Sequence, residues 1–245
     1  MPDLKTDKRR DTAAPAGPRL IIACRVMQHE LDALRQQYKD MLDQGIEICY
    51  MDQNLHLTPE KMPGLIQEQI DARADTAQNI VLGYGLCSNG IVGVTARKQN
   101  IYIPRVHDCI SLLLGSRQAY FEAFRKRAGT YYLTPGWVAE EKDPLGMVEH
   151  EYGPKMGQEM ALWGINEELK HYTHIVLINT GAGDIKKVRK RAKANAAFLD
   201  KVYEEVSGST SYFEKLLFGP YDREDFVCLA PGQRAEQKAF MKQTE

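Results

Sequence analysis

Short apolar runs that end in glycine, proline or cysteine recur along the chain, and most precede a segment with helical spacing of its apolar residues. This alternation predicts successive strands and helices. A β-α-β-α order favours a mostly parallel sheet with helices on both faces, so we expect a Rossmann-like α/β fold. The predicted strands are residues 20–24, 46–51, 79–82, 101–103 and 226–230, and two more begin the segments 129–136 and 174–181, each of which leads into a glycine turn. The predicted helices are residues 28–42, 58–74, 91–99, 118–127, 155–170 and 185–206.

The length of 245 residues suits one large α/β domain or two small lobes. Residues 1–18 are polar and contain no strand or helix signal, so we expect a disordered N-terminal lead-in. We expect a single domain over residues 19–235, with two similar lobes at 19–128 and 129–235 as an alternative, and a C-terminal tail at 236–245. A helix-strand echo between Lys61–Gly83 and Lys155–Ile178 is the basis for the two-lobe alternative.

Composition narrows the classes of function. The formal net charge is −1 and the sequence pI is near 6.6, which argues against an overall basic surface for nucleic acid or anionic membranes. No apolar run approaches the ~20 residues that a membrane span needs, and the N-terminus lacks the apolar core of a secretory signal. We therefore expect a cytoplasmic protein, in which the five cysteines do not form disulfides and a ligand or catalytic role becomes a stronger candidate for some of them.

Three cysteines, Cys24, Cys87 and Cys109, follow predicted strands. Ligands of open α/β sheets bind at the carboxyl ends of the strands, and thiolates are soft ligands that suit zinc or an iron–sulfur cluster. Three protein ligands would leave one metal position open for a small-molecule substrate. The alternative is that the cysteines are buried apolar fillers, which is the interpretation we favour for Cys49 and Cys228 inside strand patterns.

Several polar residues accompany these cysteines. His107 is a candidate general acid–base, fourth ligand or ligand partner, although a loop histidine with a structural hydrogen bond fits equally well. Arg105 is a candidate for neutralising an anionic substrate. His56 lies on a loop that should return to the same edge of the sheet and is a candidate substrate-binding residue, although a loop histidine without a functional role fits equally well. Glu30, in the first turn of a predicted helix, could face this edge or could simply favour the helix dipole.

The glycine-rich turn around Cys87 is a candidate substrate-binding element. Gly85 precedes the cysteine, and Ser88, Asn89 and Gly90 follow it. Successive backbone N–H groups in such a turn could form a nest for an anion at the start of the next helix. A second glycine-rich segment, Gly181–Asp184, matches only half of a dinucleotide-binding fingerprint and is a weak signal.

The segments Gly85-Leu86-Cys87-Ser88-Asn89-Gly90, Ile103–Cys109 and Thr130–Trp137 together resemble the DUF1638 family of prokaryotic proteins of unknown function. The resemblance spans about residues 20–232. It implies a cysteine after the first strand, a Gly-x-Cys turn, and a histidine before a third cysteine, which are here Cys24, Cys87, His107 and Cys109. Asp108 separates the last two, whereas some family members have the histidine next to the cysteine. The resemblance also implies a genomic context of corrinoid-dependent methyltransferases.

These observations support three hypotheses. The first is a metal-dependent enzyme, a transferase or lyase, whose three cysteines hold a 4Fe–4S cluster or a Zn²⁺ ion with one open position, acting on a small molecule in methyl or sulfur metabolism. The second is a non-catalytic accessory protein that binds a corrinoid protein or its methyltransferase through the basic segment Lys186–Lys193. The third is a metal-free enzyme with Cys87 as nucleophile and His107 as base.

Overall fold

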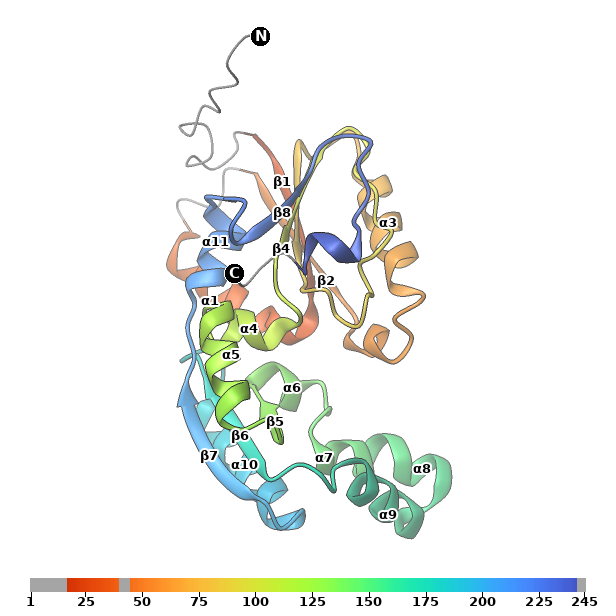
Figure 1. Ribbon diagram of the computed structural model, residues 1–245, viewed down its shortest axis with the longest axis vertical. Helices are drawn as coiled ribbons and strands as arrows, with labels where there is room; N and C mark the ends of the chain where they lie inside the picture. Colours follow the sequence, from red (N-terminus) through yellow and green to blue (C-terminus); the bar gives the residue numbers. More distant parts are fainter. Residues whose placement is uncertain (1–16, 40–44, 242–245) are drawn as a thin grey trace. The chain divides into compact units, whose positions relative to one another are not determined.

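The computed structural model describes residues 17–39 and 45–241, which divide into two compact units (Figure 1). The first unit comprises Met1–Cys24, Tyr38–Cys109 and Phe213–Glu245, and the second comprises Arg25–Gln37 and Ile110–Tyr212. The units are therefore interleaved along the chain, whereas the two lobes considered above are contiguous. The expected lead-in, apart from Gly17 and Pro18, lies outside the described residues, as do residues 242–245 of the expected tail and the end of the helix expected at 28–42.

The first unit is built on a five-stranded sheet that is parallel except at one edge. Its order is β2-β1-β3-β4-β8, and β8 runs antiparallel to β4. The interior strands β1 and β3 are apolar after a polar first residue and buried on both faces, which is typical of parallel strands covered by helices. The mostly parallel α/β fold is thus confirmed. The strands are β1 (Arg19–Cys24), β2 (Ile46–Met51), β3 (Asn79–Gly83), β4 (Asn100–Pro104) and β8 (Phe226–Leu229).

The helix α3 (Met62–Ala72) contributes Met62, Ile66 and Ile70 to the core of the first unit. These residues recur every four positions and so form one apolar face. The remaining helical elements that contribute residues to this unit are η2 (Gln53–Leu57), α4 (Cys109–Leu113), α11 (Ser211–Phe218) and η4 (Gln237–Ala239).

The second unit has a three-stranded parallel sheet with β6 in the centre, in the order β5-β6-β7. Leu133, Ile175 and Leu177 from the sheet pack with Val188 and Ala192 in its apolar core. The strands are β5 (Thr130–Leu133), β6 (His174–Asn179) and β7 (Val202–Ser207). The helices are η1 (Arg25–Met27), α1 (Gln28–Gln37), α5 (Arg117–Lys126), α6 (Pro135–Ala139), α7 (Pro144–Gly146), the π-helix η3 (Met147–Tyr152), α8 (Gly153–Met156), α9 (Gln158–Glu168) and α10 (Ile185–Phe198).

The prediction of a helix at residues 91–99 is wrong. This segment is a series of turns, in which Thr95 forms an isolated antiparallel bridge with Arg234 and Gly93 has a φ of 105°. The amide of Ala96 donates to the carbonyl of Gln233 at 2.9 Å, so the backbone hydrogen bonds of the segment go to a distant part of the chain. This long-range pairing outweighs the local apolar spacing on which the helix prediction rested.

The helix expected at residues 185–206 ends at Phe198, and its second part is strand β7. Asp200 has a φ of 53°, which breaks the helix, and residues 202–207 then pair in parallel with β6. Two other helices begin later than expected. Gly157, with a φ of 84°, separates α8 from α9 in the segment expected as one helix, and α3 begins at Met62 instead of Thr58.

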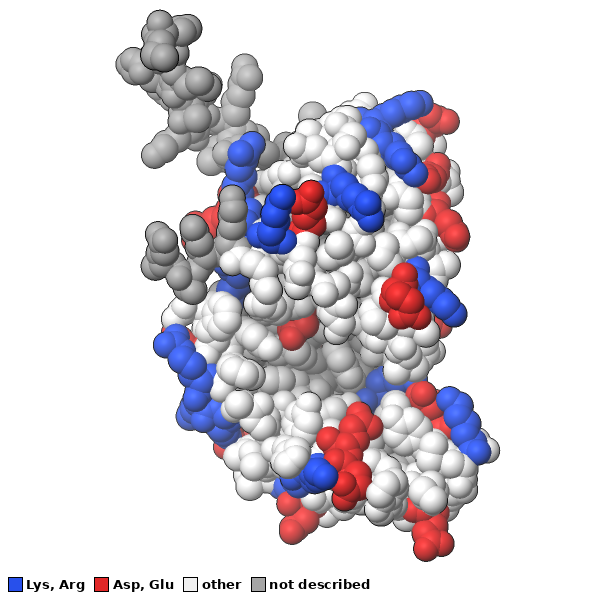
Figure 2. Space-filling view, turned by 45° about the vertical axis from the view of Figure 1, so that its right-hand side comes forward, with Lys and Arg blue, Asp and Glu red and all other residues white. Residues whose placement is uncertain are grey.

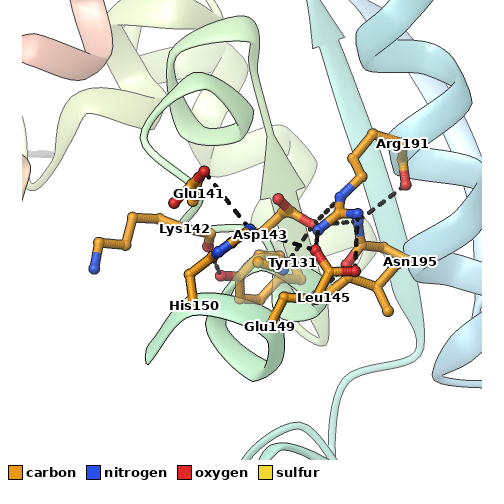
Figure 3. Close-up of polar contacts among 10 residues, drawn as sticks. Tyr131, Glu141, Lys142, Asp143, Leu145, Glu149, His150, Arg191 and Asn195 are labelled. Carbon is orange, nitrogen blue, oxygen red and sulfur yellow. Dashed lines mark hydrogen bonds and ion pairs between the residues drawn. The ribbon is translucent and has the colours of Figure 1, made fainter. Parts of the chain in front are cut away.

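A buried polar network centred on Asp143 holds the second unit together (Figure 3). Asp143 Oδ1 accepts hydrogen bonds from Arg191 Nε at 2.8 Å and from Asn195 Nδ2 at 2.6 Å. Asn195 Oδ1 in turn accepts from the amide of Leu145 at 2.8 Å, and Arg191 Nη2 donates to Glu149 Oε2 at 2.7 Å. Asp143 and Asn195 are buried with their hydrogen-bonding groups engaged, which fastens α10 to the segment from α7 to η3.

Lys and Arg side chains lie beside Asp and Glu side chains over the face drawn in Figure 2. Ion pairs of the first unit such as Arg73–Glu47 at 2.6 Å and Arg97–Asp71 at 2.9 Å also bring opposite charges together. This intermixing agrees with the near-zero net charge of the chain. Within the described ranges, no helix is long and apolar enough to span a membrane.

Candidate functional site

The three cysteines lie at one edge of the first unit's sheet. Cys24 is the last residue of β1, Cys87 follows β3 in a turn, and Cys109 begins α4 after β4. Because β1, β3 and β4 are neighbouring parallel strands, their carboxyl ends and the three cysteines share this edge. The side chains are buried, with exposed fractions of 1% for Cys24, 6% for Cys87 and 4% for Cys109. None of the five cysteines, all of which are described, forms a disulfide.

The three thiols are close enough to affect one another's ionisation. Burial raises the pKa of Cys87, and a thiolate at Cys24 raises it further. Burial also raises the pKa of Cys109, followed by charges on Cys87, Asp108 and Cys24. Coulombic effects decline with distance, so these couplings place the thiols in a common electrostatic environment. Among the described residues, however, no group of three or more His, Cys, Asp or Glu side chains is arranged as a set of metal ligands.

The turn that carries Cys87 has an unusual backbone. Cys87, Ser88 and Asn89 have consecutive φ values of 46°, 54° and 67°, a left-handed conformation that costs roughly 1–2 kcal/mol per non-glycine residue. Such conformations persist only where the surrounding structure enforces them, and they are concentrated at functional sites. Three strained residues in a row, beginning at a buried cysteine, therefore mark this turn as a candidate functional element.

Backbone hydrogen bonds hold the turn against the segment before Cys109. The amide of Leu86 donates to the carbonyl of Val106 at 2.9 Å, and the amide of Cys87 donates to the carbonyl of His107 at 2.8 Å. Gly85 is required for this approach, since a Cβ at Gly85 would lie 2.8 Å from the backbone nitrogen of Asp108. These contacts explain how residues 22 positions apart, Cys87 and Cys109, come to share one edge.

The expected anion nest lacks one of its parts, because no helix follows the turn in residues 91–99. The amide of Gly90 donates to the carbonyl of Cys87 at 2.9 Å, and a Cβ at Gly90 would lie 2.6 Å from Met62 Sδ. Gly90 therefore closes the turn and allows close packing. Ser88 and Asn89 are exposed, and their role in substrate binding, with that of Gly85, stays a prediction.

His56 lies beside one of the thiols, as expected for a residue returning to this edge. Its Nε2 atom is 3.5 Å from Cys24 Sγ, and burial lowers the pKa of its imidazole, which favours the neutral ring. A neutral imidazole can accept a proton from a thiol or donate a hydrogen bond to a bound molecule. The sequence predicted the position of His56 but not its pairing with Cys24.

Tyr84 was not among the expected site residues. It is completely buried and lies between the end of β3 and the cysteine turn. Within the described part of the chain, its hydroxyl has no hydrogen-bond partner. Burial raises its pKa, and thiolates at Cys24 and Cys87 raise it further, so the phenol belongs to the same environment. Its ring centroid is 6.3 Å from that of His56. Its position between two glycines, just before the cysteine, was the sequence signal that could have revealed it.

Arg105 and His107 make structural hydrogen bonds in addition to any role of the kind we expected. The Arg105 guanidinium donates to the carbonyls of Ala239 at 2.9 Å, Arg223 at 2.8 Å and Phe226 at 3.2 Å, which ties the end of β4 to the C-terminal part of the unit. His107 is exposed, and its main-chain carbonyl positions Cys87 by accepting a hydrogen bond from the Cys87 amide. The catalytic roles of both side chains stay predictions.

Comparison with known proteins returned one family. A family model described as a protein of unknown function, DUF1638, matches residues 50–217. This range includes Cys87, His107, Cys109 and His56, whereas Cys24 precedes it. No curated protein and no solved structure matches the chain.

Proposed function

The chain belongs to the DUF1638 family, and we propose that it is a metal-dependent enzyme whose Cys24, Cys87 and Cys109 hold a 4Fe–4S cluster or a Zn²⁺ ion. The observation that carries this proposal is the convergence of three buried thiols at neighbouring strand ends. One of them lies on a turn with three consecutive left-handed residues. Filling a core with cysteine would require neither the strain nor the shared edge.

Charge balance supports a cation at this position. Burial opposes the ionisation of Cys87 and Cys109, and neighbouring thiolates oppose it further. A bound metal reverses both effects, because cysteine ligates as the thiolate and the metal compensates its charge. The orphaned hydroxyl of Tyr84 also fits a site that lacks one of its constituents. Soft thiolate donors favour zinc or an iron–sulfur cluster over hard cations such as Mg²⁺.

When bound by three cysteines, either metal centre would supply an open position and act as a Lewis acid toward a small substrate carrying sulfur, oxygen or a methyl group. The chain's own residues would orient that substrate. The Tyr84 hydroxyl would donate a hydrogen bond to it, and the neutral imidazole of His56 would hold or accept a proton beside Cys24. Burial of the thiols would limit access of water to the site.

The test is the metal and acid-labile sulfide content of anaerobically purified protein, with a visible spectrum. We expect iron with sulfide and broad absorbance near ~400 nm, or about one zinc per chain without colour. The variants Cys24→Ala, Cys87→Ala and Cys109→Ala should each lose the metal while remaining folded. Cys49→Ala and Cys228→Ala are the matched controls, since these thiols lie within strands β2 and β8 and should not affect metal content.

Full metal content in the Cys87→Ala variant, or no metal in the native protein, would contradict the proposal. A metal-free protein that is inactivated by one equivalent of iodoacetamide would instead indicate a Cys87 nucleophile. The raised pKa of Cys87 does not favour that alternative, because the thiolate is the reactive form.

A second candidate function is that of an accessory protein for a corrinoid protein or methyltransferase. The observation that favours it is an apolar surface of the second unit formed by Met156, Met160 and Trp163, which are 48%, 53% and 63% exposed. The basic segment Lys186–Lys193 is less suited to docking than expected. Arg189 pairs with Glu205, and Arg191 pairs with Asp143 and Glu149. A pull-down from the native host that depends on Trp163 would support this candidate.

A further inference from the structure

Glu30 is a buried carboxyl group in the second unit, on helix α1, and is only half satisfied. Its exposed fraction is 0%, and its Oε1 atom accepts a hydrogen bond from Thr180 Oγ1 at 2.7 Å. Its Oε2 atom has no partner among the residues that the structure describes. Buried polar atoms are almost always hydrogen-bonded, and an unpaired one costs free energy, so this oxygen points to a partner outside the chain.

The hydrogen bond from Thr180 places Glu30 beside the loop between β6 and α10. Thr180 follows the last residue of β6, and the loop continues through Gly181 and Gly183, whose φ values are 82° and 72°. The ring of His29 lies 3.4 Å from the position that a Cβ of Gly183 would occupy. Glu30 and its neighbour His29 therefore both face this loop. A Cβ at Gly181 would have no atom within 4 Å, so the loop is open on that side.

The loop also presents backbone donors at the start of a helix. The amide of Gly181 donates to Asn179 Oδ1 at 3.0 Å, but in the described parts of the chain neither Ala182 nor Gly183 donates a hydrogen bond from its amide. The following helix α10 has 14 residues, so its N-terminus carries an appreciable positive partial charge. The carboxylate of Asp184 would repel an anion bound here. It caps the helix by accepting a hydrogen bond from the amide of Lys187 at 3.1 Å.

The protonation state of the Glu30 carboxyl determines whether it can donate a hydrogen bond to a ligand at the loop. Burial raises its pKa, and the hydrogen bond from Thr180 counteracts this only in part. Burial thus shifts Glu30 toward the neutral acid, whose unpaired oxygen could donate a hydrogen bond. The other titratable groups at the loop are His29 and Asp184, while the packed helix α6 has the sequence Pro-Gly-Trp-Val-Ala without a titratable side chain.

We infer that the β6–α10 loop, with Glu30 beneath it, binds the phosphate or carboxylate group of a small molecule. The loop amides of Ala182 and Gly183 would donate to the oxyanion, the N-terminus of α10 would stabilise its charge, and Glu30 would donate the remaining hydrogen bond. The residues of this site all belong to the second unit, whereas the three cysteines belong to the first. The glycine-rich segment Gly181–Asp184, which matched only half of a dinucleotide-binding fingerprint, is part of this proposed site.

The test is a titration of the ¹⁵N-labelled full-length protein with inorganic phosphate and, separately, with acetate, followed by the amide shifts of Ala182 and Gly183. We expect saturable shifts of these amides at millimolar concentrations, and the tighter of the two anions identifies the class of ligand. Glu30→Gln, whose amide is also a donor, should bind within about three-fold of the native protein, whereas Glu30→Met should bind roughly ten-fold more weakly or worse. Thr180→Val should weaken binding less than Glu30→Met.

The control variant is Glu167→Gln, which lies exposed on α9 and should bind as the native protein does. Absence of loop shifts with both anions in a folded protein would overturn the inference, because Glu30 would then be satisfied by water alone. Equal affinity of Glu30→Met and the native protein would also overturn it. A higher affinity in Glu30→Gln would overturn the proposed donor role, because it would show that Glu30 is ionised and repels anions. Metal content should be unchanged in every variant, which separates this test from that of the proposed metal site.

Discussion

The Asp143 network of the second unit and the cysteine edge of the first unit are both buried polar clusters, but they differ in completeness. The carboxylate of Asp143 accepts hydrogen bonds from Arg191, Asn195 and the amide of Gly146 (Figure 3). At the cysteine edge, the Tyr84 hydroxyl has no partner in the described residues, the thiols oppose one another's ionisation, and the turn is strained. The first arrangement stabilises the fold, whereas the second stores unfavourable interactions that a bound group could relieve.

The largest effect on stability should come from breaking the satisfied cluster. Asp143→Ala leaves Asn195 and the Arg191 guanidinium without their buried acceptor, and we expect it to lower the free energy of unfolding by about 3 kcal/mol. The measurement is the urea midpoint of the metal-free protein. Glu149→Gln, which removes the exposed arm of the same network, should cost less than about 1 kcal/mol. Equal effects of the two variants would contradict the assigned role of Asp143.

Removing the unsatisfied group at the cysteine edge should act in the opposite direction. Tyr84→Phe keeps the buried ring and eliminates the orphaned hydroxyl, so we expect the metal-free protein to become more stable by about 1 kcal/mol or more. Tyr221→Phe is the matched control. The Tyr221 hydroxyl donates to the carbonyl of Leu216 at 2.9 Å, so its loss should destabilise by about 1 kcal/mol. Destabilisation by Tyr84→Phe would show that its hydroxyl is already satisfied.

The backbone of the cysteine turn offers a third contrast. Ser88 is exposed and has a φ of 54°, so Ser88→Gly should relieve strain and stabilise the metal-free protein by up to about 1 kcal/mol. Asp200→Gly, at a φ of 53° in the second unit, should gain a similar amount. Only Ser88→Gly should also weaken metal binding, since it loosens the turn that positions Cys87. Unchanged metal affinity in Ser88→Gly would separate the strain from the proposed function.

The smallest effect concerns a carboxylate paired at the surface. Hydrogen bonds from Arg189 lower the pKa of Glu205 from 4.5 to about 2. A lowered carboxylate pKa stabilises the fold above pH 4.5, and this contribution disappears as the pH falls through about 2. Because the pair is partly exposed, Glu205→Gln should cost only about 0.5 kcal/mol at neutral pH and nothing near pH 2. A difference that does not depend on pH would exclude this ion pair as its source.

The strands of the fold were predictable because their signal is local. Asn79–Gly83 and His174–Asn179 each have a short central run of buried apolar residues. Segments whose structure depends on distant partners were not predictable. Thr95 pairs with Arg234 instead of continuing a helix, and residues 202–207 form a strand because the open edge of β6 is available to them.

The features of the candidate site likewise divide into those that the sequence predicted and those that it did not. The strand-end positions of Cys24, Cys87 and Cys109 followed from the sequence, because a parallel sheet brings the carboxyl ends of its strands to one edge. The approach of His56 to Cys24, the isolation of the Tyr84 hydroxyl and the second cluster at Glu30 did not. Each of these depends on the burial and orientation of side chains from segments distant in sequence.

By itself, the sequence determined the α/β class, the DUF1638 family and the three cysteines as the residues of interest, because residue type, apolar spacing and glycine position act locally. Only the tertiary structure decided which polar groups are satisfied and which are not. It completed the hydrogen bonds of Asp143 but left Glu30 and Tyr84 each with a polar atom that has no partner among the described residues. Hydrogen-bond satisfaction depends on where the whole chain places each partner, and no local pattern contains that information.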